Sequence, residues 1–128
     1  MRFLVMVKAD EGFEKGAVPS ADELAAMGRY NDELIKAGVL LAGEGLLESA
    51  RGARVKFTNG IPTVIDGPFA EAKELVAGFW LLDVKSKEEA IEWVKRVPCV
   101  GGAESAIEIR QVYEAEDLIA AVNTNHGE

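Results

Sequence analysis

The chain has 128 residues and a formal net charge of −8, from 14 basic and 22 acidic side chains. This length fits one compact domain over residues 1–128, and the 48% hydrophobic content excludes a disordered chain. The acidic balance argues against phosphate backbones and anionic lipid as partners. One cysteine and one histidine are too few for a disulfide or a Cys/His metal cluster. We therefore expect no metal, no cofactor, no nucleic acid and no membrane partner.

Residues 2–8 predict a strand that is apolar on both faces. The alternation places Phe3, Val5 and Val7 on one side and Leu4 and Met6 on the other. This apolar run is too short for a signal sequence or a membrane span, so a cytoplasmic protein is expected.

A helix over residues 21–37 follows a polar loop. Ser20 with Glu23 three residues later is typical of a capping box, and Gly38 ends the helical pattern. The next apolar run, residues 39–42, predicts a second strand.

A β-hairpin is the clearest feature of the middle of the chain. Residues 43–45, Gly-Glu-Gly, are expected to interrupt the second strand first. The strands at 55–58 and 61–65 are then joined by Asn59-Gly60, whose residues suit positive φ angles. Pro62 cannot donate a ladder hydrogen bond and marks an outer edge.

The last third of the chain predicts a strand, a helix and a strand. After a break at 66–69, residues 76–84 are the most strand-like run of the sequence. A second capping box begins a helix at Ser86 that Pro98 closes. Residues 106–113 form the final strand.

This order predicts an α+β fold of the ferredoxin-like βαββαβ type with an inserted hairpin. Both helices should cover one face of a four-stranded antiparallel sheet and leave the other face bare. Because two of the strands are apolar on both sides, a bare face would forfeit on the order of 10 kcal/mol of burial. We expect a homodimer whose sheets face each other and can hold a small ligand between them.

The stretch at residues 66–74, Asp-Gly-Pro-Phe-Ala-Glu-Ala-Lys-Glu, resembles the signature of YCII-related proteins of the DGPF type. Gly78-Phe79, Gly43-Glu44-Gly45, residues 89–93 and residues 108–110 extend the resemblance over nearly the whole chain. It implies a dimeric α/β-barrel architecture and little about chemistry. Most such relatives have no assigned reaction, and some are encoded beside extracytoplasmic-function sigma factors. The broader group includes dehydrochlorinase-type lyases.

Two positions depart from the pattern of the wider group. Some small relatives carry a His-Asp pair proposed as catalytic, but residues 21–37 contain no histidine and Lys36 stands where the aspartate would align. The His-Asp mechanism therefore does not transfer to this chain. Gln111 stands where relatives usually have proline, which affects the edge of the last strand more than its chemistry.

The DGPF segment supplies the candidate catalytic residues. If it lines the cavity, Asp66 or Glu71 could act as a general base and Lys73 could hold an anionic oxygen. The ligand-contacting residues of this segment would be Gly67, Pro68, Phe69 and Lys73. In the structural alternative, Asp66 caps the turn, Phe69 fills the core, and Glu71 forms solvated pairs with Lys73 or Glu74.

Three charged residues are candidates on the bare face. Glu108 and Arg110 alternate with Ile107 and Ile109 along the last strand, so their side chains should point away from the helices. A charged side chain buried in a dry interface needs a partner of opposite charge. Arg110 could grip a ligand carboxylate, or Glu44 or Glu71 of the protein itself. Glu44 either points inward between its glycines or faces water.

The remaining conspicuous residues have structural interpretations. Trp80 and Trp93 are expected in the core. Cys99 is interpreted as an inert thiol, and Gly101-Gly102 as a loop without a phosphate-binding pattern. His126 is expected in a mobile polar tail.

The leading hypothesis is a small-molecule-binding homodimer that takes a small organic acid or aromatic metabolite in an accessory or regulatory role. The first alternative is a cofactor-independent acid/base enzyme of the lyase, dehydrochlorinase or isomerase type. The second is an interaction module that works with a sigma factor.

Overall fold

The computed structural model describes residues 1–98 and 105–126. The predictions for Cys99 and for Gly101-Gly102 fall outside the described residues. The strands are β1 (Arg2–Lys8), β2 (Leu40–Gly45), β3 (Ala53–Thr58), β4 (Ile61–Asp66), β5 (Val76–Asp83) and β6 (Ile107–Gln111). The helices are α1 (Glu11–Glu14), α2 (Ala21–Lys36), α3 (Lys87–Val94) and α4 (Ala115–His126), with 3₁₀ turns η1 (Ser49–Arg51) and η2 (Ala72–Glu74).

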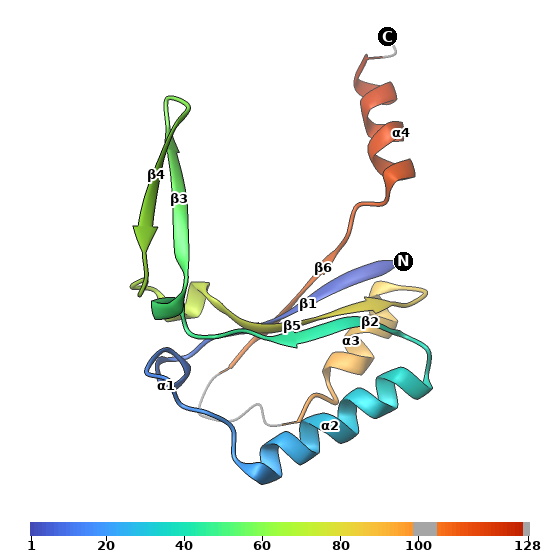
Figure 1. Cartoon of the computed structure of the whole chain (residues 1–128). Coiled ribbons are helices and arrows are strands. Elements are labelled where there is room, and N and C mark those ends of the chain that lie inside the picture. Colours follow the sequence, from blue (N-terminus) through green and yellow to red (C-terminus); the bar gives the residue numbers. More distant parts are fainter. Residues whose placement is uncertain (99–104, 127–128) are drawn as a thin grey trace.

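The main sheet has the strand order β2-β5-β1-β6, and every neighbouring pair is antiparallel. Helices α2 and α3 both lie against one side of this sheet (Figure 1). The two central strands, β1 and β5, come from different halves of the chain and pair with each other, as in a ferredoxin-like fold. The predicted α+β order with an inserted hairpin is confirmed.

The core lies between the sheet and the two helices. The least exposed large side chains are Phe3, Val5, Leu34 and Leu82, each at 1% exposure or less. Trp80 is also buried, its indole nitrogen donates to Asn31 Oδ1 at 2.8 Å, and its ring meets Tyr30 edge-on. Trp93 packs against this cluster. Both tryptophans therefore serve the core, as predicted.

The two long helices begin where the capping boxes place them. The hydroxyl of Ser20 accepts from Glu23 N at 3.1 Å, and that of Ser86 accepts from Glu89 N at 3.1 Å. Each bond satisfies one of the amide groups left free at a helix start. Helix α2 ends before Gly38, whose φ of +74° is readily adopted only by glycine.

Strand β2 corrects one sequence expectation, because it continues through residues 43–45 instead of being interrupted there. A Cβ on Gly43 would lie 2.8 Å from Cδ1 of Trp80. A Cβ on Gly78, across the ladder, would lie 3.1 Å from the Glu44 carbonyl oxygen. The glycines here make room for a bulky ring and for a close neighbouring strand rather than breaking the strand.

Strands β3 and β4 form a separate two-stranded hairpin that stands away from the main sheet (Figure 1). Asn59 and Gly60 have φ angles of +52° and +80°, as expected for the predicted turn. Every residue of both strands is exposed. The hairpin therefore does not cover the side of the sheet that lacks helices.

The C-terminal region is a helix and not the mobile tail predicted for His126. Helix α4 follows Glu114, whose carboxylate accepts two hydrogen bonds from the Arg2 guanidinium at 2.9 and 3.0 Å. Glu116 and Asp117 in its first turn suit a helix N-terminus. The run Leu118 to Val122 contains strong helix formers that the tail interpretation overlooked.

Within the described residues, no helix combines the length and the apolar character that a membrane crossing requires.

Candidate functional site

The side of the main sheet opposite α2 and α3, called here the open face, carries two cross-strand rows. Residues directly opposite each other in antiparallel strands share a face. The first row reads Glu108, Met6, Phe79, Glu44, and the second reads Arg110, Leu4, Leu81, Ala42. The central members Leu4, Met6, Phe79 and Leu81 are half-buried by their neighbours. The open face therefore has an apolar centre with charged residues on its two edge strands.

The β6 edge of the open face carries a small charged cluster. Glu108 lies between Lys8 Nζ at 3.9 Å and Arg110 Nη1 at 3.4 Å. The Arg110 side chain is 72% exposed. The predicted orientation of Glu108 and Arg110, away from the helices, agrees with the register of β6 against β1.

The partner of Arg110 differs from the two that the sequence suggested. Its carboxylate neighbour is Glu108, two residues away on the same strand. Glu44 lies on the far edge strand, so three strand spacings of about 4.8 Å separate the two backbones. Within one chain Arg110 and Glu44 therefore stand on opposite rims of the apolar centre.

Gly67 of the DGPF segment is packed against the backbone of η1. A Cβ at this position would lie 1.7 Å from the Ser49 carbonyl oxygen, a distance that no side chain can occupy. The Gly67 amide donates to the Gly52 carbonyl at 3.1 Å, and the following bond to Pro68 is cis. The role of Gly67 in this structure is close packing of two loops at the base of the hairpin.

Phe69 is held from both sides. Its amide donates to Ser49 Oγ at 3.0 Å, and the Arg54 guanidinium lies 3.8 Å from the centre of its ring. Ser49 itself donates through its backbone N at 2.8 Å and through its hydroxyl to the carboxylate of Glu14. The DGPF segment thus ties the hairpin to η1 and α1. Phe69 is half-buried at the base of the hairpin and does not belong to the core cluster, where the structural alternative expected it.

The ionisable residues of the DGPF segment are exposed, and the structure shows no ion pair between them and Arg110 among the described residues. Asp66 is the last residue of β4, Glu71 precedes η2, and Lys73 lies within η2. The amide of Ala9 donates to the Leu75 carbonyl at 2.9 Å, so η2 meets the chain just after β1. The catalytic roles of Asp66 and Glu71 and the ligand-binding role of Lys73 stay predictions.

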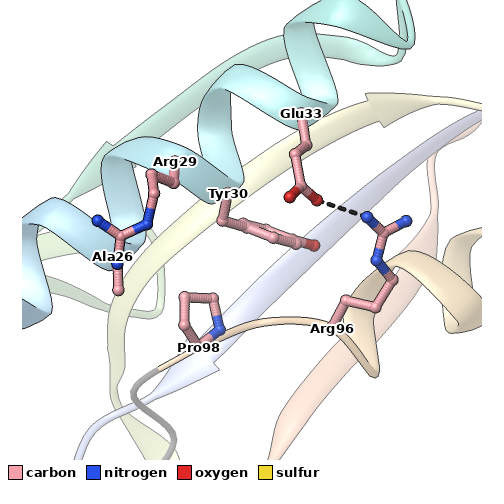
Figure 2. A pocket seen from close by; sticks show the side chains of 6 residues that line it. All are labelled: Ala26, Arg29, Tyr30, Glu33, Arg96 and Pro98. Atoms are coloured by element: carbon pink, nitrogen blue, oxygen red, sulfur yellow. Dashed lines mark hydrogen bonds and ion pairs between the residues drawn. The ribbon is translucent and has the colours of Figure 1, made fainter.

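A hollow of about 300 Å³ lies on the helix side between α2 and the segment that follows α3 (Figure 2). Its lining includes Tyr30, whose hydroxyl donates to the Trp93 carbonyl at 2.7 Å, and an ion pair of Glu33 with Arg96. Burial raises the pKa of Tyr30 to about 12. The Tyr30 hydroxyl and the Glu33–Arg96 pair therefore already have partners, and Arg29 is the further charged residue of this lining.

The described part of the chain contains no group of three or more His, Cys, Asp or Glu residues placed to hold a metal ion. Its fully buried side-chain nitrogen and oxygen atoms all have hydrogen-bond partners.

The sheet order, the two covering helices and the inserted hairpin define a ferredoxin-like α+β protein. The sequence matches the YCII-related domain over residues 1–116, and the chain therefore belongs to the YCII-related family. It is also similar to an uncharacterised protein of Rhizobium meliloti (strain 1021), with 27% identity over 112 residues that cover 86% of this chain and 90% of that protein. These likenesses confirm the family resemblance and carry no activity with them.

The sequence did not suggest that Lys8 lies beside Glu108, or that Ser49 bonds to Glu14. Lys8 has the same strand parity as Leu4 and Met6, and that signal could have placed it near Glu108. Ser49 and Glu14 lie in segments far apart in the chain, and no spacing rule brings them together.

Proposed function

We propose that this protein is a homodimer whose two open faces enclose a site for a small organic acid or aromatic molecule, in an accessory or regulatory role. The observation that supports this most directly is the apolar centre of the open face, with Arg110 at its rim. Within residues 1–98 and 105–126, no helix or strand packs over this centre in the way that α2 and α3 pack over the opposite side (Figure 1). Apolar surfaces that no covering element buries are typical of interfaces and ligand sites.

The chemistry of the open face favours a ligand with both a ring and an anionic group. Phe79 and Leu81 offer apolar contact to a flat or branched carbon skeleton. Among the residues that the structure describes, Glu108 is the carboxylate partner of Arg110, at 3.4 Å, and the Arg110 side chain is largely exposed, so further guanidinium donors could bind a ligand carboxylate. Enclosure by a second sheet would strengthen that contact by removing water.

Sedimentation of the full chain tests the dimer. We expect a species of twice the 13.8 kDa chain mass, and the variant Leu81→Asp should sediment as a monomer while keeping its far-UV circular dichroism. Leu24→Asp is the matched control, because Leu24 is 59% exposed and lies on α2, away from the open face. A monomeric wild-type protein would disprove the shared site.

A melting-temperature screen with small aromatic carboxylates tests the site. A binding compound should raise the melting temperature of the wild type, and Arg110→Ala should abolish the shift. Arg29→Ala is the control, because Arg29 lines the hollow of Figure 2 instead. Loss of the shift in Arg29→Ala and not in Arg110→Ala would move the site to the helix side.

The catalytic alternative predicts a different result for Asp66. If Asp66 acts as a base, Asp66→Asn should retain the fold and the melting temperature but lose turnover of any compound that the screen identifies. An effect on the melting temperature alone would assign Asp66 to the hairpin base.

A further inference from the structure

One face of the hairpin is apolar and exposed. The register of β3 with β4 puts Val55 opposite Val64 and Phe57 opposite Pro62 on the same side. Val55, Phe57 and Val64 are 52%, 68% and 66% exposed. An isolated two-stranded hairpin is marginal in water, so this apolar side needs a partner to be held in place.

Helix α4 carries a second exposed apolar surface. Leu118, Ile119 and Val122 are spaced as neighbours on one side of a helix and are 48%, 62% and 54% exposed. All residues from 115 to 124 are exposed. Most of α4 lies beyond residue 116, where the match with the YCII-related domain ends.

The hairpin and α4 project from the sheet on the same side, opposite to α2 and α3, and stand near opposite ends of its strands (Figure 1). They therefore flank the open face at its two ends. A second sheet docked on that face would have to fit between them.

We propose that in the homodimer α4 of one copy packs on the apolar side of the partner's hairpin, so that each sheet is held by two such arms. This inference rests on the proposed dimer. A two-fold axis between the facing sheets that runs across the strands carries the hairpin of one copy to the end where α4 of the other stands. An axis that runs along the strands would instead place hairpin against hairpin and helix against helix.

Charge favours the first arrangement. The register of β3 with β4 places Arg54 and Lys56 on the side of the hairpin opposite to Val55, and with Asp66 they give the two strands a net charge of +1. The first turn of α4 carries Glu116 and Asp117. Hairpin against hairpin would pair two elements of net positive charge, and helix against helix would pair two elements of net negative charge. Pairing unlike elements brings opposite charges together at both ends of the dimer.

Disulfide cross-linking in a Cys99→Ser background distinguishes the two arrangements. Val64→Cys and Val122→Cys are prepared as separate proteins, mixed so that subunits exchange, and oxidised. We expect the mixed sample to form covalent dimers at least about tenfold faster than either protein alone. Faster cross-linking of Val64→Cys with itself or of Val122→Cys with itself would overturn the proposal.

A charge exchange gives a second test that needs no cysteine. Lys56→Glu and Glu116→Lys should each raise the dimer dissociation constant several-fold, and the two changes in one chain should restore it. Val18→Asp is a control for added charge, because Val18 is 85% exposed in the loop before α2. A dimer that survives both single changes unaltered would overturn the arm contact and leave the proposed sheet-to-sheet dimer standing. A monomeric wild type would overturn both.

Discussion

The two faces of the main sheet are built from the same strands but completed in different ways. On the helix side, Phe3 and Val5 are each 1% exposed, because α2 and α3 cover them. On the open face, Leu4 and Met6 alternate with them and stay half-buried. The alternation of the sequence predicts apolar side chains on both faces, but in the part of the chain that the structure describes, helices cover only one of them. Burial on the helix face therefore stabilises the folded single chain, whereas burial on the open face would stabilise the proposed dimer.

The largest expected effect comes from Phe3→Ala on the helix side. Removing this side chain leaves a cavity in a closed core and should lower the free energy of unfolding by about 3–5 kcal/mol. Urea denaturation followed by circular dichroism measures the loss. Leu4→Ala is the matched control on the open face, where the main loss should appear in self-association. Equal losses of chain stability without any change in association would contradict the contrast between the faces.

Gly43→Ala should have the next largest effect, because the new Cβ would lie 2.8 Å from the Trp80 ring on the helix side. Displacing the ring should cost about 1–3 kcal/mol of stability. Gly45 lies two residues further along β2 and a Cβ there would meet nothing within 4 Å. Gly45→Ala should therefore leave the urea midpoint nearly unchanged or raise it slightly. Similar losses of stability in both variants would show that the contact with Trp80 is not the reason why alanine destabilises β2.

Tyr30→Phe should cost about 1 kcal/mol, because it leaves the Trp93 carbonyl without its hydrogen bond. It should also change how the free energy of unfolding depends on pH above 10. Burial raises the pKa of Tyr30 from 10.0 to about 12, so the unfolded chain ionises first and stability falls as the pH rises from 10 to 12. In Tyr30→Phe this fall should be shallower. Tyr113→Phe, at a side chain that is 66% exposed, should leave the slope as it is in the wild type.

Local signals account for most of the fold. The two Ser-Glu capping boxes, the Asn59-Gly60 turn and the alternation in β1 and β5 each predict an element that the structure contains. Helix α4 was predicted as a tail although residues 118–122 include strong helix formers. The expectation for residues 43–45 failed for a different reason, because a glycine has more than one possible role. Gly43 was expected to interrupt a strand, yet it makes room for Trp80, which is 37 residues away in sequence. Such a role depends on a tertiary contact that no local pattern encodes.

The candidate site was predictable only in part. Strand parity places Glu108 and Arg110 on the open face, as the structure does. In the DGPF segment, the sequence suggested roles for the ionisable residues. The structure instead shows contacts of its apolar positions: Gly67 packs against Ser49, and Phe69 contacts Ser49 and Arg54. A motif identifies where a chain is constrained, whereas the reason for the constraint lies in contacts between distant segments.

The smallest expected effect concerns the pair that attaches α4 to the end of the sheet. Hydrogen bonding to Arg2 holds the pKa of the Glu114 carboxyl below its usual 4.5. A lowered pKa stabilises the folded state above pH 4.5, and that contribution is lost as the pH falls below it. Glu114→Gln should therefore lower the melting temperature slightly at pH 7, and the difference should shrink as the pH falls below 4.5, with Glu74→Gln at an exposed side chain of η2 as control. Because the pair is exposed on both sides, salt should shrink the difference at pH 7. A difference that persists in acid would assign Glu114 a packing role at the start of α4 in place of an electrostatic one.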